Sequence, residues 1–428
     1  MNKRILLMIT GLSPQVITET IYAHFVQHEL DDTVPTEVHL ITTKEGAERA
    51  ELLLLAPNTG HFRNLIYEYK INNVESFETP EHLIFEEKVL HNIDSIIDLV
   101  GDKDRLIPHA KTHKSKDTLS LLIDNGIKKH KTSTLNELEV LAECDPETLI
   151  LAYPITSITK AKRLENIVEN FPKTKFYTII SNNFHFDLIK NVKNLAGIYI
   201  DLDTGMNRTG ILKENVSDLL DYISSNNYKN LKGIHAYDGQ TYGVVSVEDR
   251  VIDTQNSLKD IREVEKLVKE KFSINDFEII VGGSWSFHFY IKEKDIKLSP
   301  GTWIYWDISN IKQKELSFKI AGVILGQVID ENKSNDTVTI DIGAKAVSSD
   351  PLTENRLKLI DKPNSKLISQ NEEHGIIKLN GDSLGLGDYV LAQPGHACTV
   401  TPKYNRALKI DKNGDVSGVI TPHARDRV

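Results

Sequence analysis

The segment PHAKTHK, residues 108–114, places a single lysine, Lys111, between two histidines. A lysine amine becomes nucleophilic when burial or neighbouring cations lower its pKa, and such an amine can form an imine with an aldehyde cofactor. The flanking residues His109 and His113 would tune its protonation. While these residues are taken alone, a basic surface loop is the simpler interpretation.

Two glycine-containing segments follow predicted strands. The segment DTGMNRTG brings Arg208 to the end of one strand, and the segment VGGS, which contains Gly282, Gly283 and Ser284, ends another. Barrel enzymes keep their sites at the carboxyl ends of strands. Paired glycines let backbone N–H groups approach a phosphate, and a serine adds a hydroxyl donor. Ordinary turns account for both segments equally well.

His396 and Cys398 stand two residues apart, so on an extended segment they point to one side. Imidazole and thiolate are preferred zinc ligands, and two protein ligands leave positions for water and substrate. A structural role is the commoner explanation of an isolated pair. The other cysteine, Cys144, has no histidine nearby and is interpreted as an ordinary, partly buried residue.

The composition is that of a soluble globular protein of two or three domains, with 428 residues, 40% hydrophobic and 26% charged. A net charge of −10 without a long basic run gives no reason to expect nucleic acid or an acidic membrane as partner. No apolar run approaches the roughly 20 residues of a membrane span. Two cysteines form no disulfide framework, and we expect a cytoplasmic protein.

The elements that would position these side chains alternate between strand and helix. Helices are predicted between short apolar strands at residues 149–152, 175–180, 197–202, 233–237 and 277–282. Such repeated units favour an α/β fold with a parallel (β/α)8 TIM-like barrel, and a doubly wound open sheet is the alternative.

Beyond about residue 310 the helical pattern ends, and short strands separated by Asn, Asp and Gly turns predict a β-rich domain. The predicted domains are a partial Rossmann-like segment over residues 1–73, the barrel over 74–310 and the β-rich domain over 311–428. A first strand at about 82–85 could join the C-terminal domain.

From about residue 76 to the end, the chain resembles the D-serine dehydratase and D-threonine aldolase family. That family is related to the alanine racemases of the third fold type of pyridoxal-phosphate (PLP) enzymes. The resemblance rests on ordered segments: ETP (78–80), PHAKTHK (108–114), AYP (152–154), DTGMNRTG (203–210), AYDG (236–239), VGGS (281–284), SPGT (299–302), DIGAKAVSSD (341–350), EHG (373–375) and HAC (396–398).

The resemblance implies that Lys111 forms the imine with PLP and that the strand-end glycines hold the phosphate. The implied cofactor-binding residues are His109, Lys111, Arg208, Tyr237, Gly282, Gly283 and Ser284, and the implied zinc ligands are His396 and Cys398. Dehydratase-type members carry cysteine at the second metal position, where aldolase-type members usually carry an acidic ligand. Cysteine also favours zinc over manganese or magnesium. Gln240 stands where aldolase-like members commonly have histidine.

The first hypothesis is therefore a PLP- and zinc-dependent lyase that converts D-serine to pyruvate and ammonia. Retro-aldol cleavage of a D-threonine-type substrate to glycine and an aldehyde is the second. A non-catalytic PLP carrier, which would not need the metal pair, is a further alternative. By family analogy we expect a homodimer.

The first 73 residues resemble the start of CRISPR-associated ring nucleases, whose CARF-like Rossmann domain binds cyclic oligoadenylates. The resemblance rests on ILLMITGLSPQVITET (5–20) and VHLITTKEGAERA (38–50). It implies nucleotide-facing loops at residues 11–15 and 42–46. Only the first part of such a domain is present, and a half sheet would leave an unpaired edge. A cyclic-oligoadenylate receptor on a degenerate enzyme scaffold is the remaining hypothesis.

Overall fold

The computed structural model describes residues 5–9, 37–41, 69–274 and 276–427, and the chain divides into two compact units at residue 71. In the first unit, β1 (Ile5–Ile9) and β2 (Glu37–Ile41) pair in parallel. The predicted nucleotide-facing loops at 11–15 and 42–46 lie outside the described residues.

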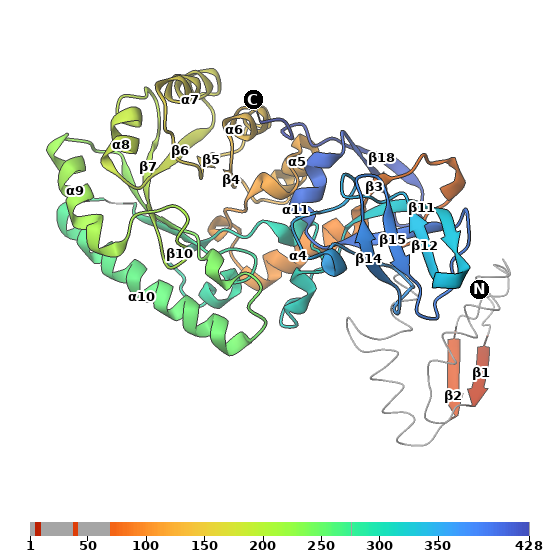
Figure 1. Cartoon of the computed structure of the whole chain (residues 1–428). Helices are drawn as coiled ribbons and strands as arrows, with labels where there is room; N and C mark the ends of the chain where they lie inside the picture. The colour runs from red at the N-terminus through yellow and green to blue at the C-terminus, as the bar shows by residue number, and fades with distance from the viewer. Residues whose placement is uncertain (1–4, 10–36, 42–68, 275, 428) are drawn as a thin grey trace. The chain divides into compact units, whose positions relative to one another are not determined.

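The second unit contains a curled parallel sheet in the order β10-β9-β8-β7-β6-β5-β4 (Figure 1). Its strands are β4 (Lys129–Thr132), β5 (Thr148–Leu151), β6 (Lys175–Ile180), β7 (Gly197–Leu202), β8 (Leu231–Ala236), β9 (Glu278–Val281) and β10 (Ile296–Leu298). The helices that alternate with them are α5 (Lys116–Asp124), α6 (Leu135–Ala142), α7 (Ile158–Asn170), α8 (Asn183–Ile189), α9 (Val216–Ser225) and α10 (Val247–Lys271).

The irregular segment 106–109 joins the two edges of this sheet. Leu106 forms a parallel bridge with Leu298 of β10, and His109 forms one with Lys131 of β4. Backbone hydrogen bonds of 2.9 to 3.0 Å run along both seams. The predicted α/β barrel architecture is confirmed, with seven regular strands and this segment in place of an eighth. The closing segment leads directly to Lys111.

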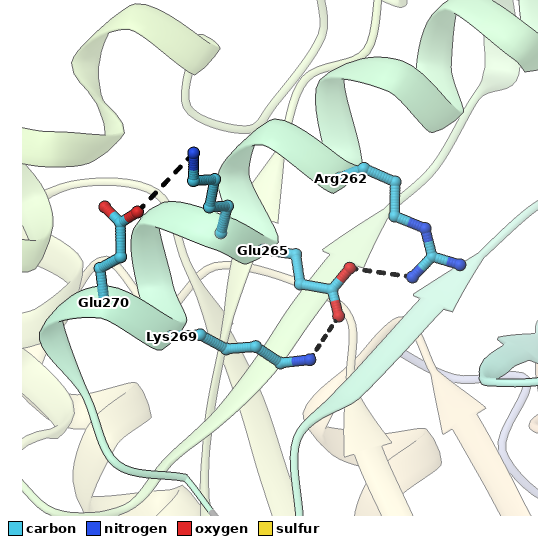
Figure 2. A pocket seen from close by; sticks show the side chains of 5 residues that line it. Arg262, Glu265, Lys269 and Glu270 are labelled. Carbon is cyan, nitrogen blue, oxygen red and sulfur yellow. Dashed lines mark hydrogen bonds and ion pairs between the residues drawn. The ribbon is translucent and has the colours of Figure 1, made fainter.

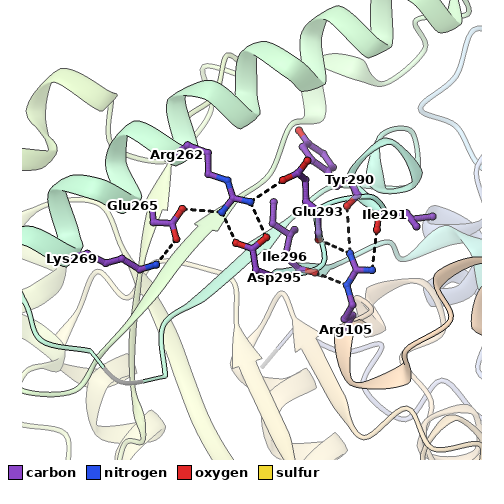
Figure 3. A network of polar contacts seen from close by, with 9 residues as sticks. All are labelled: Arg105, Arg262, Glu265, Lys269, Tyr290, Ile291, Glu293, Asp295 and Ile296. Carbon is purple, nitrogen blue, oxygen red and sulfur yellow. Dashed lines mark hydrogen bonds and ion pairs between the residues drawn. The ribbon is translucent and has the colours of Figure 1, made fainter.

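Arg105 anchors the closing segment at its start. Its guanidinium is 3% exposed and donates at 2.8 to 3.4 Å to four backbone carbonyls, those of Tyr290, Ile291, Glu293 and Ile296 (Figure 3). Arg262 of α10 pairs with Glu293 and Asp295 of the same stretch. The segment before β10 is thereby fixed to both the helix and the closing segment, which limits the movement of the backbone below Lys111.

The outer face of α10 carries a cluster of charged side chains that pair with one another. A shallow surface hollow is lined by Arg262, Glu265, Lys266, Lys269 and Glu270 (Figure 2). Glu265 pairs with Arg262 and Lys269, and Lys266 pairs with Glu270. Exposed pairs three or four residues apart on a helix contribute only about 0.2 to 0.5 kcal/mol each. None of the predicted site residues lies there.

The C-terminal sheet takes one strand from the start of the second unit. β3 (Glu81–Phe85) pairs antiparallel with β11 (Gly322–Asn332) and parallel with β17 (Ala407–Ile410). From β3, α4 (Glu86–Val100) leads to the barrel. The remaining strands are β12 (Thr337–Ile340), β13 (Leu357–Leu359), β14 (Lys366–Gln370), β15 (Gly375–Lys378), β16 (Tyr389–Pro394) and β18 (Val416–Ile420). No helix in the described part of the chain has the length and apolar character to cross a membrane.

Candidate active site

A cavity of about 330 Å³ opens where the barrel strands end and the C-terminal domain begins. This size falls in the range of small-molecule and cofactor sites. All the predicted site residues except Gly282 line it: His109, Lys111, Arg208, Tyr237, Gly283, Ser284, His396 and Cys398. The structure thus brings together segments that are almost 300 residues apart, and Lys111 does not lie in a surface loop.

Lys111 lies in a single 3-10 turn, Ala110–Thr112, directly after the closing segment. Its backbone N–H donates to Nδ1 of His109 at 3.2 Å, which fixes the turn. The Lys111 Nζ lies 5.6 Å from the centre of the Tyr237 ring, and the Arg208 guanidinium carbon lies 5.0 Å from the same centre. The amine and the guanidinium therefore both lie within cation–π distance of the Tyr237 ring, and such contacts are stronger where water is excluded.

The two histidines that flank Lys111 have different surroundings. Burial, followed by the positive charges of Lys111 and Lys131, holds the pKa of His109 well below its ordinary value, so this ring is neutral in the cavity wall. His113 does not line the cavity and instead bonds to the backbone of Ser115. Only His109 is positioned to influence the Lys111 amine directly.

The glycines after β9 shape the wall against Tyr237. A Cβ on Gly283 would come within 2.8 Å of the Tyr237 ring, so only glycine leaves this space open. Gly282 has φ +86°, and a Cβ there would meet the Phe287 backbone at 2.9 Å, which makes it the turn residue. The Ser284 hydroxyl accepts from the Thr302 N–H at 3.0 Å, and its own hydrogen remains available to a ligand.

A buried carboxylate holds this glycine loop in place. Asp238 is 2% exposed and accepts hydrogen bonds from the Ser286 hydroxyl at 2.6 Å and the Tyr290 hydroxyl at 2.8 Å. The Ser286 oxygen in turn accepts from the Gly283 N–H at 2.9 Å. Burial raises the pKa of Asp238, and these donors oppose that shift. The loop is therefore preformed by contacts inside the protein.

The opposite wall of the cavity comes from the loop after β16 and from α11 (Ala397–Val400). The Nδ1 atom of His396 lies 2.5 Å from Asp350, and the His396 ring also bonds to the Cys398 thiol. The thiol lies 3.1 Å from the hydroxyl of Thr112, the residue after Lys111. A carboxylate on one ring nitrogen orients the other, as it does in many metal-ligating histidines.

The imidazole and the thiol shift each other's titration. Burial disfavours the charged ring of His396, but the bonds to Asp350 and Cys398 outweigh it and raise the pKa. Burial likewise opposes ionisation of Cys398, yet the bond to His396 and the charge of Lys111 lower the thiol pKa to about 7. Across the described residues no cluster of three or more His, Cys, Asp and Glu side chains could hold a metal ion.

Three further polar residues at the cavity were not singled out from the sequence. Lys131 of β4 and His235 of β8 line it, and Asp201 of β7 bonds to His235 from behind. They lie on separate strands within an apolar interior that includes Ile107, Ile150, Tyr177, Ile179, Tyr199 and Ile280. For Asp201 and His235 the available signal was a polar residue at an inward position of a predicted barrel strand, since such positions normally carry branched apolar side chains. No strand was predicted around Lys131, so the sequence offered no such signal there.

Two family models match the chain along its length. The model described as "Alanine racemase, N-terminal domain" matches residues 84–307, and that described as "Putative serine dehydratase domain" matches residues 321–410. The first covers more than half of the 428 residues. The chain therefore belongs to the alanine racemase N-terminal domain family, the barrel family of the fold type III PLP enzymes.

Its relatives include lyases as well as racemases. The 3-hydroxy-D-aspartate aldolase of Paracoccus denitrificans is 24% identical over 343 residues, which cover 74% of this chain and 84% of the relative. An alanine racemase of Clostridium perfringens is 21% identical over 281 residues, covering 60% of this chain and 70% of the relative.

Solved structures share the fold. The D-threonine aldolase from Filomicrobium marinum superimposes with a TM-score of 0.75 at 18% identity, covering 82% of this chain and 96% of that chain. The D-threo-3-hydroxyaspartate dehydratase from Delftia sp. HT23 gives a TM-score of 0.71 at 17% identity, covering 82% of this chain and 98% of that one.

Proposed function

We propose that this protein is a PLP- and zinc-dependent lyase that acts on a β-hydroxy D-amino acid, with D-serine dehydration to pyruvate and ammonia as its reaction. One observation carries the proposal. Lys111 and the His396–Cys398 pair line the same cavity, and the Cys398 sulfur lies 3.1 Å from the residue next to Lys111. One small substrate could therefore meet an amine at its α-carbon and, at its β-hydroxyl, a metal ion held by His396 and Cys398.

The residues of the cavity fit the PLP cofactor. Lys111 supplies the primary amine that an aldehyde requires, and Arg208 and Tyr237 flank it. Gly283 leaves open a space that any side chain would fill, and Ser284 offers a hydroxyl for the phosphate. When bound, PLP serves as an electron sink for charge that develops on the α-carbon.

Lys111 then has two tasks. Its amine would hold the cofactor, and as a free amine it would take the α-proton of the substrate. Lys111 lines the cavity, and its amine lies 5.6 Å from the Tyr237 ring centre. The neutral His109 accepts from its backbone N–H.

The donor set of the opposite wall fits zinc. Imidazole nitrogen and thiolate sulfur are zinc ligands, and the Asp350 carboxylate already fixes the orientation of the His396 ring. His396 and Cys398 would hold the ion, which would act as a Lewis acid towards the β-hydroxyl of the substrate. Two protein ligands leave room for that hydroxyl.

The position of Gln240 favours dehydration over retro-aldol cleavage. The aldolase path requires a base that removes the proton of the β-hydroxyl. The Gln240 amide instead donates to the Thr204 carbonyl at 3.0 Å and to the Ser257 hydroxyl at 3.2 Å, and it does not line the cavity. An amide cannot act as that base. Retro-aldol cleavage remains the second candidate because two of the relatives named above are aldolases.

Product analysis tests the proposal directly. The purified protein is loaded with PLP and zinc and incubated separately with D-serine, D-threonine and D-threo-3-hydroxyaspartate. We expect keto acid and ammonia from D-serine, loss of the reaction with chelator, and its recovery on zinc addition. Glycine as the product would instead establish the aldolase, and no turnover together with no PLP absorption band would reject a PLP lyase altogether.

A further inference from the structure

A chain of three buried polar side chains crosses the barrel interior below the cavity. The Lys131 Nζ lies 3.1 Å from Nε2 of His235, and Nδ1 of the same ring lies 2.7 Å from Oδ1 of Asp201. The three residues are 2%, 4% and 5% exposed and come from β4, β8 and β7. Lys131 and His235 face the cavity that also holds Lys111.

Hydrogen-bonding rules fix the direction of this chain. An ionised carboxylate only accepts, so the His235 ring carries its hydrogen on Nδ1, towards Asp201. Nε2 then has a lone pair and accepts from the Lys131 amine. Burial, followed by the charge of Lys131, lowers the pKa of His235, in agreement with a neutral ring. The amine is thus aimed by the ring and keeps two hydrogens for other partners.

A purely structural explanation of Lys131 is poor. A buried charge costs several kcal/mol unless it is paired, and well-packed apolar residues usually serve a core equally well or better. Asp201 acts on the amine through the intervening imidazole, and the charge of Asp238 also favours the protonated form. Burial, followed by repulsion from Lys111, lowers the pKa of the Lys131 amine to about 7. A hydrogen-bond acceptor or an anion bound in the cavity would offset the cost of burying the charged amine. This indicates that the Lys131 amine binds a ligand.

We propose that Lys131 is a second cofactor-facing lysine, which donates a charged hydrogen bond to the polar edge of the PLP ring, and that His235 and Asp201 are positioning residues that aim it. The inference rests on the proposed function in so far as PLP is the ligand. It adds a binding residue on a strand that carries none of the residues singled out from the sequence.

The positions of the cavity residues favour the PLP ring, rather than the phosphate or the metal, as the partner of Lys131. The phosphate cradle lies at the ends of β9 and β10, with Gly283, Ser284 and Thr302. The metal pair comes from the C-terminal domain. Lys131 lies on β4 and reaches across the barrel to His235 of β8, the residue two before Tyr237. The phenolic oxygen and the ring nitrogen are the remaining polar atoms of PLP, and Lys131 and Arg208 are the cationic donors of the barrel wall that remain for them.

The test compares K131M with a matched control, K129M. Lys129 is on the same strand, outside the cavity, and pairs with Glu147 at 3.8 Å. Loss of a charged hydrogen bond should weaken PLP binding about tenfold or more. It should also shift the absorption band of the bound cofactor and its pH titration, because a cation at the ring changes its electron distribution. K129M should keep the wild-type dissociation constant and spectrum.

A second variant, D201N, keeps the Lys131 amine and removes the negative charge that bonds to the other side of the His235 ring. A positioning role predicts a shift of the absorption band in the same direction as in K131M, but smaller. Wild-type spectra, titration and PLP affinity in folded K131M would overturn the inference, and so would a change confined to the KM for the amino acid. If wild-type protein forms no absorption band with PLP, the proposed function itself fails. If it forms one that K111A abolishes while K131M leaves its position, its pH titration and the PLP affinity unchanged, the proposed function survives and the role of Lys131 does not.

Discussion

The two walls of the cavity carry opposite kinds of chemistry. The barrel wall presents Lys111, Lys131 and Arg208, whereas the C-terminal wall presents the imidazole of His396 and the thiol of Cys398. The carboxylate of Asp350 holds the His396 ring. The barrel wall suits an anionic, ring-shaped ligand, and the other wall suits a soft divalent metal. Under the proposed function, the barrel wall would bind the cofactor and the C-terminal wall would activate the leaving group, so variants should affect one without the other.

The largest effect should come from the barrel wall. In K111A we expect the absorption band of covalently bound PLP to disappear and turnover to fall by at least about 10² to 10⁴-fold, since both the anchor and the α-proton base are lost. Borohydride reduction followed by peptide mass spectrometry should locate the cofactor on Lys111. The control K116A changes a lysine of α5 that pairs with Glu143. Label on another lysine would contradict the assignment.

The next effect should be confined to the C-terminal wall. H396A and C398S should each lose bound zinc and most turnover, because two ligands leave no reserve. The PLP spectrum should stay close to that of the wild type, since Lys111 and the glycine cradle belong to the barrel. Zinc content by atomic emission and the absorption spectrum are measured on the same samples. Full turnover in zinc-free H396A would exclude the proposed role of the metal.

Sequence patterns predicted this division only in part. Lys111, His396 and Cys398 were predicted because the ordered segments that contain them resemble a known family, whereas each segment alone had a simpler structural explanation. Lys131 and its partners could not be found in this way, because topology alone brings β4, β7 and β8 together. The closing segment 106–109 and the entry of β3 into the C-terminal sheet likewise depend on long-range pairing.

A smaller effect should follow from loss of the carboxylate behind His396. D350N removes the acceptor at Nδ1 and should weaken zinc binding by about 10 to 100-fold, the usual consequence of losing such a partner. Added zinc should then restore turnover, which it would not do in H396A. The control D336N changes an aspartate of the same domain that pairs with Lys378. Equal zinc affinity in D350N and D336N would show that Asp350 does not position the ring.

The last effect concerns the stability of the barrel side in acid rather than turnover. Burial lowers the pKa of His130 to about 4, below the value of about 6.5 for an unfolded histidine. The unfolded chain therefore binds a proton first, and stability that is present above pH 6.5 is lost as the pH falls towards 4. At about 1.4 kcal/mol per pH unit, this one residue accounts for roughly 3 kcal/mol.

His130 tests this account because its Nε2 bonds to the Ile127 carbonyl at 2.8 Å while Nδ1 has no partner. In H130Q the amide can keep that bond without titrating, so the free energy of unfolding should fall less steeply between pH 6.5 and 4. Urea unfolding at several pH values measures the slope, with the exposed H374Q as control. Parallel slopes for H130Q and wild type would mean that other groups dominate. A shallower slope in H130Q alone would assign part of the acid lability to the barrel, where a neutral ring has to be protonated when the chain unfolds.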